Sequence, residues 1–295
     1  MKKKKKISVG RILLNGILLL MSFGYIVPIL LMLAISFSSE QSVREFGYRL
    51  LPNQFSLDAY AQVFKNPTRI VNAYKITVLY TVLSTALAVV IQTLMAYPLS
   101  RSNYNKKKLL TVFLMITMFF SGGLVPSYIL NTQYLHIGNT FWIYIFPGLV
   151  SAWNVILFKT FFKGLPEELV EAAKLDGASE FLVYGRIIMP LSTPIIACIA
   201  FTTALAKWND WNTSLLYIRD NNLYSLQYLL QRIINESDYI KNMQGTDAAA
   251  LVGTELPAET MKYAVAILAA GPMMIVFPFF QKYFAKGLVV GSVKG

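Results

Sequence analysis

The residues best suited to chemistry in this chain form one short segment, Lys207–Asn212, which reads Lys-Trp-Asn-Asp-Trp-Asn. Aromatic faces can stack on sugar rings, and amides and carboxylates can hydrogen bond to hydroxyls, so the segment suits a neutral polyhydroxy solute. A structural interpretation stays open, because Trp is a common anchor at a membrane edge and Lys and Asp three residues apart form an ordinary helix pair. The candidate solute contacts are Trp208, Asn209, Asp210 and Trp211.

Two further polar side chains, Asn154 and Gln92, fall in otherwise apolar stretches and are weaker candidates for a solute path. Such groups can equally hydrogen bond across helices. The chain has one Cys, Cys198, and one His, His136, which are too few for a metal site or for catalysis based on these residue types. The sequence has no phosphate-binding G-x-x-x-x-G-K-[ST] motif. We therefore expect no catalytic residue, no metal site and no cofactor bound by this chain.

The elements that must position these residues are hydrophobic. Of the 295 residues, 55% are hydrophobic and 14% are charged, whereas about 25% of a soluble domain is charged. The mean hydropathy is +0.50. A net charge of +12 could indicate nucleic-acid binding, but the chain has too little polar surface for a basic face. These values predict an integral membrane protein that lies in a lipid bilayer and binds no nucleic acid.

Apolar stretches long enough to cross a hydrocarbon core of about 30 Å recur along the chain. The stretch 109–158 is too long for one helix and is interrupted by polar residues near 131–139, so we divide it into two spans. Gly122-Gly123 and Gly271-Pro272 would kink their helices. The sequence predicts an all-α, polytopic fold with six transmembrane helices, at 12–37, 76–100, two within 109–158, 187–216 and 263–281.

The distribution of basic residues predicts the orientation of these helices. With the N-terminus inside, 16 of the 27 Lys and Arg residues lie in cytoplasmic segments and 9 lie outside. This bias places both termini in the cytoplasm. The expected organisation is a basic cytoplasmic N-terminus (1–11), a transmembrane domain (12–285) and a cytoplasmic C-terminal tail (286–295), with outer loops at 38–72 and 219–260 and an inner loop at 163–190.

The inner loop 163–190 is unusual because acids outnumber bases on a side of the membrane that is otherwise basic. Pro166 followed by two Glu residues is typical of a helix start, and Gly177 of a helix end. An amphipathic helix lying on lipid would suit an anionic leaflet poorly with this charge. A docking element for a soluble protein fits better. The five acids are Glu167, Glu168, Glu171, Asp176 and Glu180.

The same loop resembles a known sequence motif. Glu171-Ala172-Ala173, Gly177, Ile187 and Met189-Pro190 match the pattern EAA-x3-G-x9-I-x-L-P, with Met189 in place of the usual Leu. This is similar to the EAA motif of permease subunits of binding-protein-dependent ABC importers. The resemblance extends over about residues 10–295 and is greatest to carbohydrate permeases of the maltose-system type. Within these, the C-terminal sequence 278–295 resembles the subgroup for complex oligosaccharides.

The resemblance implies a type I ABC importer permease fold in the cell membrane of a bacterium. It implies a transporter subunit without enzymatic activity, paired with a second homologous permease, two cytoplasmic ATPase subunits that bind ATP and Mg²⁺, and an extracytoplasmic solute-binding protein. By the matching positions, the residues that couple this chain to the ATPase are Glu171, Ala172, Ala173, Asp176 and Gly177. The terminal residues 291–295 would reach the ATPase pair. We expect oligosaccharide import by alternating access.

Two alternatives remain. The solute of an ABC permease could be other than a sugar. An ion-coupled secondary transporter would need charged relays deep in several spans, and only Lys159, Lys207 and Asp210 are available for such relays.

Overall fold

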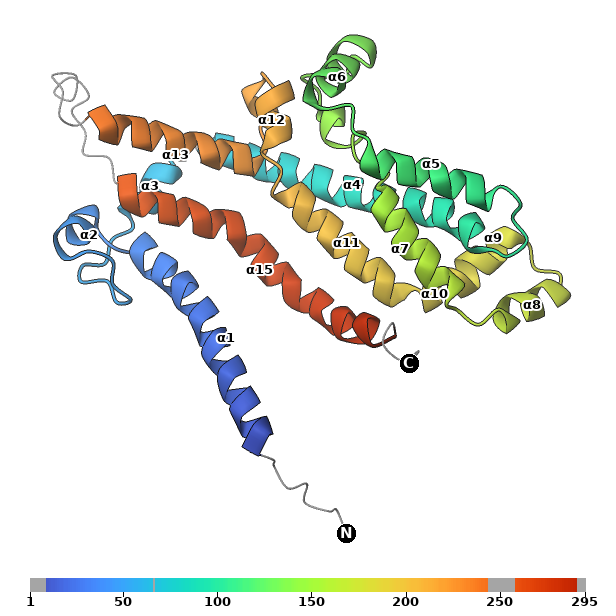
Figure 1. Ribbon diagram of the computed structural model, residues 1–295. Coiled ribbons are helices and arrows are strands. Elements are labelled where there is room, and N and C mark those ends of the chain that lie inside the picture. The colour runs from blue at the N-terminus through green and yellow to red at the C-terminus, as the bar shows by residue number, and fades with distance from the viewer. Residues whose placement is uncertain (1–8, 66, 244–257, 291–295) are drawn as a thin grey trace. The chain divides into compact units, whose positions relative to one another are not determined.

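The computed structural model describes residues 9–65, 67–243 and 258–290, and within them every regular element is helical (Figure 1). The one strand-like feature in these ranges is an isolated antiparallel bridge between Ser38 and Phe55. The predicted all-α class is therefore confirmed. The basic run at 2–6 and the C-terminal residues 291–295 lie outside the described residues.

The chain divides into two compact units, which we describe separately. The first unit contains residues 1–67 and 230–271, and the second contains 68–229 and 272–295. Two of the later helices, α13 (Leu226–Met243) and α15 (Ala258–Val290), each contribute residues to both units.

The first unit begins with α1 (Val9–Ser36), which is long and apolar enough to cross a membrane. Its side chains are largely exposed, with Leu19 and Leu20 more than 70% accessible. Exposed leucine over successive turns is stable only against lipid or another apolar surface. The prediction of a first span at 12–37 agrees with this helix to within a few residues.

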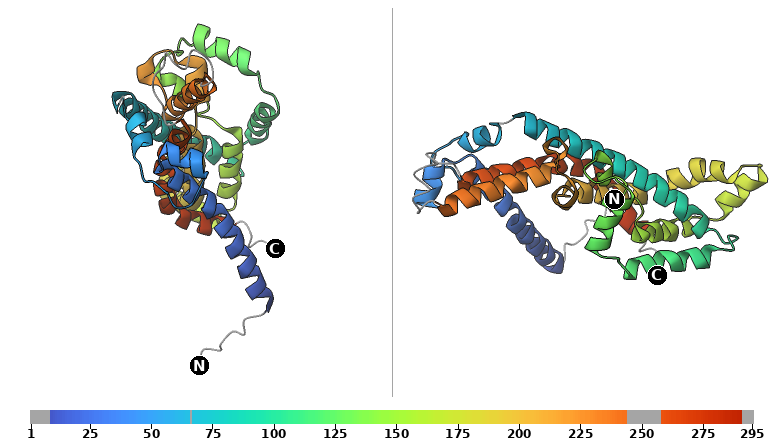
Figure 2. Two further views of the ribbon diagram at one scale, coloured as in Figure 1. Left: turned by 90° about the vertical axis from the view of Figure 1, so that its left-hand side faces the viewer. Right: turned by 90° about the horizontal axis from the view of Figure 1, so that it is seen from above.

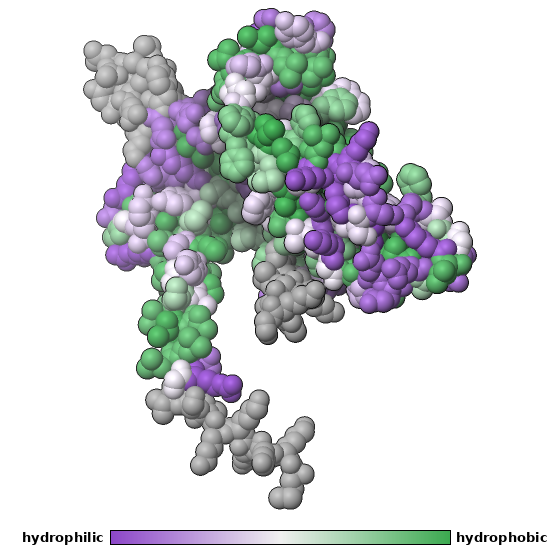
Figure 3. All heavy atoms as spheres, turned by 45° about the vertical axis from the view of Figure 1, so that its right-hand side comes forward, coloured by the Kyte–Doolittle hydropathy of each residue, from purple (hydrophilic) through white to green (hydrophobic). Residues whose placement is uncertain are grey.

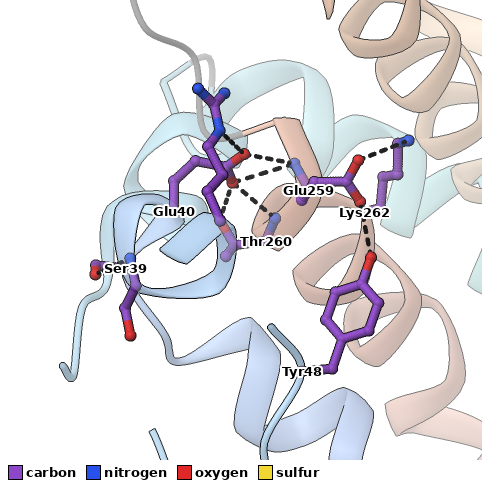
Figure 4. A network of polar contacts seen from close by, with 8 residues as sticks. Ser39, Glu40, Tyr48, Glu259, Thr260 and Lys262 are labelled. Atoms are coloured by element: carbon purple, nitrogen blue, oxygen red, sulfur yellow. Dashed lines mark hydrogen bonds and ion pairs between the residues drawn. The ribbon is translucent and has the colours of Figure 1, made fainter. Parts of the chain in front are cut away.

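Short helices α2 (Glu40–Phe46) and α3 (Asp58–Val63) follow in the first unit. The Glu40 carboxylate accepts hydrogen bonds from the backbone N–H groups of Glu259 and Thr260, at 3.1 and 3.0 Å, and from the Thr260 hydroxyl at 3.1 Å (Figure 4). These N–H groups open α15, so Glu40 acts as a remote cap with the charge that a helix N-terminus favours. This contact ties the loop after α1 to the start of the last helix.

Tyr48 adds a second tie between the same two segments. Its hydroxyl donates to the Glu259 carboxylate at 3.3 Å, and its ring meets the Tyr263 ring edge-on, with centroids 5.7 Å apart. A hydrogen bond to Tyr263, together with burial and the Glu259 charge, raises the pKa of Tyr48 to about 12. The Tyr48 hydroxyl therefore remains a donor at physiological pH.

The second unit is organised along α4 (Pro67–Ser100), a helix long and apolar enough to span a membrane. One face of α4 is buried at every fourth position, while residues such as Val82 on other faces are more than 60% exposed. This pattern fits a helix with one face against protein and the rest against lipid. The consecutive buried positions at this spacing include Tyr80, Ser84, Ala88, Gln92 and Ala96.

The third apolar stretch is broken where the two glycines predict it. Helix α5 (Lys107–Phe119) ends before Gly122-Gly123, and the following segment, α6 (Leu124–Ile129) with the π-helical turn η1 (Leu130–Tyr134), is bent by 109° from it. Gly123 has a φ of 85°, which side chains adopt only with strain. The pair counts as at most one span.

Between η1 and α7 the chain is not a long helix. It contains a 3-10 turn, η2 (Phe141–Tyr144), and then α7 (Ala152–Lys163), whose 12 residues extend about 18 Å. That length falls short of the roughly 30 Å of a hydrocarbon core. The structure thus contains no full-length helix for the fourth predicted span.

The fifth apolar stretch consists of several short pieces leading into α11 (Thr193–Trp208). These are α9 (Glu180–Val183), the π-helical turn η3 (Tyr184–Ile188) and α10 (Met189–Leu191), which together bend by 78° relative to α11. The break falls between Leu191 and Thr193. By length and composition, the described residues hold three spanning helices, or up to five if each bent pair is one span.

The last span, α15, remains helical across Gly271-Pro272 and contains both Pro272 and Pro278. Its apolar part, 259–283, matches the prediction of a sixth span at 263–281.

Candidate functional site

The acidic inner loop folds as a helix, a turn and a second helix. Helix α8 (Glu168–Leu175) begins two residues after Pro166 and places Glu168 and Glu171 in its first turn. Acids there interact favourably with the positive end of the helix. The expected helix start is therefore right to within two residues.

Gly177 ends α8 in a specific hydrogen-bonded turn. The Ala178 N–H donates to the Ala173 carbonyl at 2.9 Å, and the Gly177 N–H donates to the Lys174 carbonyl at 3.0 Å. This pair of bonds is the Schellman motif, which requires a left-handed residue at the position of Gly177. Its φ is 78°. Since only glycine adopts this conformation freely, the geometry explains the Gly of the sequence motif.

Polar contacts fasten the loop to the helices behind it. The Lys174 ammonium lies 2.6 Å from the Glu180 carboxylate, and the Tyr97 hydroxyl of α4 donates to the same carboxylate at 2.5 Å. These two contacts lower the pKa of Glu180, so its side chain stays charged at neutral pH. The Ser102 hydroxyl donates to Glu167 at 3.0 Å.

Apolar side chains also pack the same loop against α4 and α7. Val170 of α8 and Val183 of α9 are buried in a cluster that includes Phe158 and Phe162 of α7 and Ala96 of α4. A close-packed cluster transmits displacement with little deformation. The loop and the adjoining ends of α4 and α7 therefore form one stiff body.

The outer surface of the loop is mixed acidic and apolar. Helices α8 and α9 project at one end of the second unit (Figures 1 and 2), and Leu175 and Phe181 there are 89% and 80% exposed. Large apolar side chains this accessible on a charged loop are typical of a protein-binding surface. Sequence reasoning missed both, although Leu175 lies one turn after Glu171 and so shares its face. The predicted coupling residues Glu171, Ala172, Asp176 and Gly177 are exposed, and Ala173 is half-buried.

The second candidate region, Lys207–Asn212, lies where α11 ends and α12 (Asn212–Tyr217) begins. The Lys207 ammonium donates to the backbone carbonyls of Tyr144 and Pro147, at 2.7 and 3.2 Å. The Asp210 carboxylate accepts from the N–H and hydroxyl of Thr213, at 3.0 and 2.6 Å, and so caps the start of α12. Both charged groups thus hold the backbone in place.

The other candidates in this segment differ in accessibility. Trp208 is 3% exposed and borders a cavity of about 630 Å³ whose lining is almost entirely apolar. Trp211 is 41% exposed. Asn209 is exposed, and its amide donates to the Leu205 carbonyl at 2.9 Å. Among the four candidates, Trp211 and Asn209 are therefore the two exposed residues that can contact a solute.

The two weaker candidates, Gln92 and Asn154, form their hydrogen bonds with residues outside the segment Lys207–Asn212. Gln92 is 1% exposed, and its amide donates to the Leu149 carbonyl at 2.8 Å, which links α4 to the turn before α7. Asn154 is half-buried in the first turn of α7, where its backbone N–H donates to the Ser151 hydroxyl at 3.4 Å. The Gln92 contact matches the interpretation that such groups bond across helices.

A buried polar cluster that no sequence pattern predicts positions this region. Tyr80 and Tyr144 stack with centroids 4.4 Å apart, and the Tyr80 hydroxyl donates to the Lys207 carbonyl at 3.0 Å. The Tyr144 hydroxyl lies 2.6 Å from that of Ser214, which donates to Ser225 at 2.9 Å. The four residues come from α4, η2, α12 and the turn before α13, so no spacing rule connects them.

Comparison with known proteins identifies the family of this chain. Residues 73–290 match the family described as binding-protein-dependent transport system inner membrane component. The chain belongs to this family, the membrane-embedded permease subunits of ABC importers. Such a subunit is not an enzyme, and the ATPase is a separate subunit.

Individual relatives match over nearly the whole chain. The polygalacturonan/rhamnogalacturonan transport system permease protein YtcP of Bacillus subtilis (strain 168) is 36% identical over 96% of this chain and 97% of its own length. Protein LplC of the same organism is 37% identical, over 92% of this chain and 90% of its own. A chain of a bacterial ABC transporter involved in the import of the acidic polysaccharide alginate, known from a crystal structure, has 26% identity. It superposes with a TM-score of 0.80 and covers 94% of this chain and 99% of that one.

Proposed function

We propose that this chain forms half of the translocation path of an ATP-driven importer for a carbohydrate, specifically an oligosaccharide. The family match and the fold of the alginate importer support the permease role, and the names of the relatives support the solute class. The proposed complex contains a second permease of this family, two ATPase subunits that bind ATP and Mg²⁺, and an extracytoplasmic binding protein. This chain itself is proposed to bind no cofactor.

The proposed topology keeps six membrane crossings with both termini in the cytoplasm. The basic residues support this orientation, and α7 with the turns before it would make the crossing that lacks a full-length helix. Non-helical backbone at membrane depth is tolerated where protein buries it. In this segment the second half of η2 is buried, with Ile143 and Tyr144 at most 1% exposed.

The observation that best supports a role in coupling to the ATPase is the structure of the loop at 163–190. Its outer surface presents Glu171, Leu175 and Phe181, while its inner side is fixed to α4 and α7 by Glu180 and Val170. An ATPase bound to the outer surface can thus move the helices without first bending the loop. Closure of the ATPase pair on ATP would shift the permease pair between inward-open and outward-open states.

The proposed solute contacts are Trp211 and Asn209, with Trp208, Asp210, Asn154 and Gln92 shaping the wall behind them. Their exposure supports this division of roles. An exposed Trp offers one face for stacking on a sugar ring, and an exposed amide offers a donor and an acceptor for hydroxyls.

The test of the coupling role is Glu171→Lys in the full transporter reconstituted in vesicles. Glu171 forms no ion pair with another described residue, so reversing its charge breaks no ion pair within the described part of this chain. We expect normal membrane insertion, but loss of binding-protein-stimulated ATPase activity and of uptake. The control is Arg186→Glu, a charge reversal of the same size and opposite sign at an exposed position of the same loop that the motif leaves unspecified.

Normal uptake by the Glu171→Lys transporter would contradict the coupling role. The solute class is tested separately, by thermal unfolding of the cognate binding protein with oligosaccharides and with amino acids. If amino acids alone stabilise the binding protein, the proposed importer function would stand but the proposed carbohydrate solute would be refuted.

A further inference from the structure

The second unit contains a large cavity that the coupling role leaves unexplained. It lies between the loop after α4, the first turns of α5 and the last turns of α7, and its volume is about 740 Å³. That size is typical of small-molecule sites. Five of its lining residues are basic: Arg101, Lys107, Lys108, Lys159 and Lys163.

The positive charge of this cavity is not balanced within the described part of the chain. Glu167 is the one acid in the lining, and its carboxylate is engaged by the Ser102 hydroxyl. None of the five basic residues forms an ion pair with a described residue. The Lys107 ammonium donates only to the backbone carbonyls of Arg101 and Ser102, and that of Lys159 to the Thr111 hydroxyl at 2.8 Å. Neutral oxygens satisfy these donors geometrically but leave their charge uncompensated.

Arg101 shows the same imbalance in more detail. Its guanidinium lies over the Tyr97 ring, 4.7 Å from the centroid. Its Nε and Nη2 atoms are inaccessible and have no hydrogen-bond partner among the described residues. Buried, unpaired N–H groups of a cation are costly. Glu180, which lines a neighbouring cavity together with Arg101, is already paired with Lys174.

The position of the cavity on α5 adds to this field. Lys107 and Lys108 occupy the first turn of α5, which contains no acidic residue. A helix N-terminus carries partial positive charge, so bases there are unfavourable unless an anion is near. The helix dipole and five basic side chains thus point to the same missing partner, an anion.

One wall of the cavity is apolar. It is formed by Val112 and Met115 of α5 together with Phe162 and Leu165. Met115 lies seven residues after Lys108, which places it about 10 Å further along the helix. Val112 and Met115 are both about 45% exposed, and they continue into the apolar surface of the α5 span. Figure 3 shows hydrophilic residues gathered over the end of this unit that contains α8, with hydrophobic residues beyond them.

We propose that this cavity binds the headgroup of an anionic phospholipid, with the acyl chains along Val112 and Met115. A phosphodiester at a membrane surface supplies the missing anion, and basic pockets between spanning helices are suited to such headgroups. A free phosphate would use the basic end and leave the apolar wall uncovered. Placing the cavity at the cytoplasmic leaflet rests on the proposed topology, whereas the binding chemistry does not.

The experiment measures lipid retention by native mass spectrometry on the transporter purified through a tag on this chain. The probes are phosphatidylglycerol and phosphatidylcholine with identical acyl chains. The variant Lys108→Gln/Lys163→Gln removes two exposed bases that make no hydrogen bond or ion pair with a described residue. The matched control, Lys106→Gln/Arg186→Gln, removes two exposed bases from the same end of the unit that do not line the cavity.

We expect the wild type and the control to retain phosphatidylglycerol in preference to phosphatidylcholine. We expect the cavity variant to bind phosphatidylglycerol roughly 30-fold more weakly, since each of the two bases contributes about fivefold near a membrane surface. Equal losses in both variants, or no preference for phosphatidylglycerol in the wild type, would overturn the proposal. Displacement of the lipid by millimolar inorganic phosphate would assign the cavity to a free anion.

One further outcome would also overturn it. If lipid retention is unchanged in the cavity variant but the ATPase subunit no longer co-purifies, the cavity is a protein interface. Because lipid retention is measured without transport or ATP hydrolysis, it can fail while the importer function stands, and the reverse also holds.

Discussion

Replacing Gly177 by Ala would test whether the turn after α8 makes the coupling loop stiff. A Cβ added at Gly177 meets no atom within 4 Å, so the substitution introduces no clash. Its whole effect comes from the φ of 78°, which costs an L-residue about 1–2 kcal/mol. The two Schellman hydrogen bonds, to the carbonyls of Ala173 and Lys174, are the contacts that this strain weakens.

A cost of 1–2 kcal/mol raises the population of the opened turn by roughly 5- to 30-fold. We therefore expect amide hydrogen exchange in the peptide covering 173–183 to accelerate by a similar factor in the purified transporter. ATPase stimulation by the binding protein should fall, because a frayed helix transmits less displacement. Gly177→Asn should be milder, since Asn tolerates the left-handed conformation.

Gly185→Ala is the matched control. Gly185 lies in η3 eight residues further on, has no positive φ, and a Cβ added there also meets nothing within 4 Å. We expect it to leave both exchange and ATPase stimulation unchanged. Equal exchange rates in the two Ala variants would refute the argument that the left-handed turn controls the stiffness of the loop.

Two further predictions concern the region around α12. Tyr144→Phe deletes a buried hydroxyl that contacts Ser214 and the Leu223 carbonyl. We expect it to lower the free energy of unfolding by about 1–3 kcal/mol, measured by thermal unfolding. The control is Tyr134→Phe, because Tyr134 is 75% exposed, and an equal effect of the two substitutions would show that the cluster does not stabilise the protein. Trp211→Ala should lower uptake roughly two- to tenfold with an unchanged unfolding temperature, because an exposed ring contributes stacking on the solute and little to packing; unchanged uptake would exclude Trp211 from the solute path.

The motif loop was predictable in detail because its determinants are local. Acids after Pro166, apolar residues at helical spacing and a glycine at the end specify a helix and its stop within one segment. The exposed Leu175 and Phe181 were not predicted, because an apolar residue on a short helix can face either the core or a partner. Only the packing of Val170 and Val183 shows which face is left outside.

The candidate solute segment shows the opposite situation. Its residue types predict sugar chemistry or an ion pair between Lys207 and Asp210, with no means of choosing. In the structure, the Lys207 ammonium binds carbonyls more than 50 residues away in the chain, and Asp210 caps the next helix. Such partners are invisible to sequence spacing, since they depend on how α4, η2 and α11 pack.

The sequence by itself determined the class of protein, because low charge, long apolar runs and the EAA pattern are properties of composition and local order. It also determined where the helix after Pro166 ends, since the glycine turn closes through neighbouring residues. The tertiary structure decided how the apolar stretches are divided, because the sizes of the bends, 109° after α5 and 78° before α11, do not follow from the residue pattern. It also assembled the basic cavity, whose residues come from three segments and whose unbalanced charge is visible only when they meet.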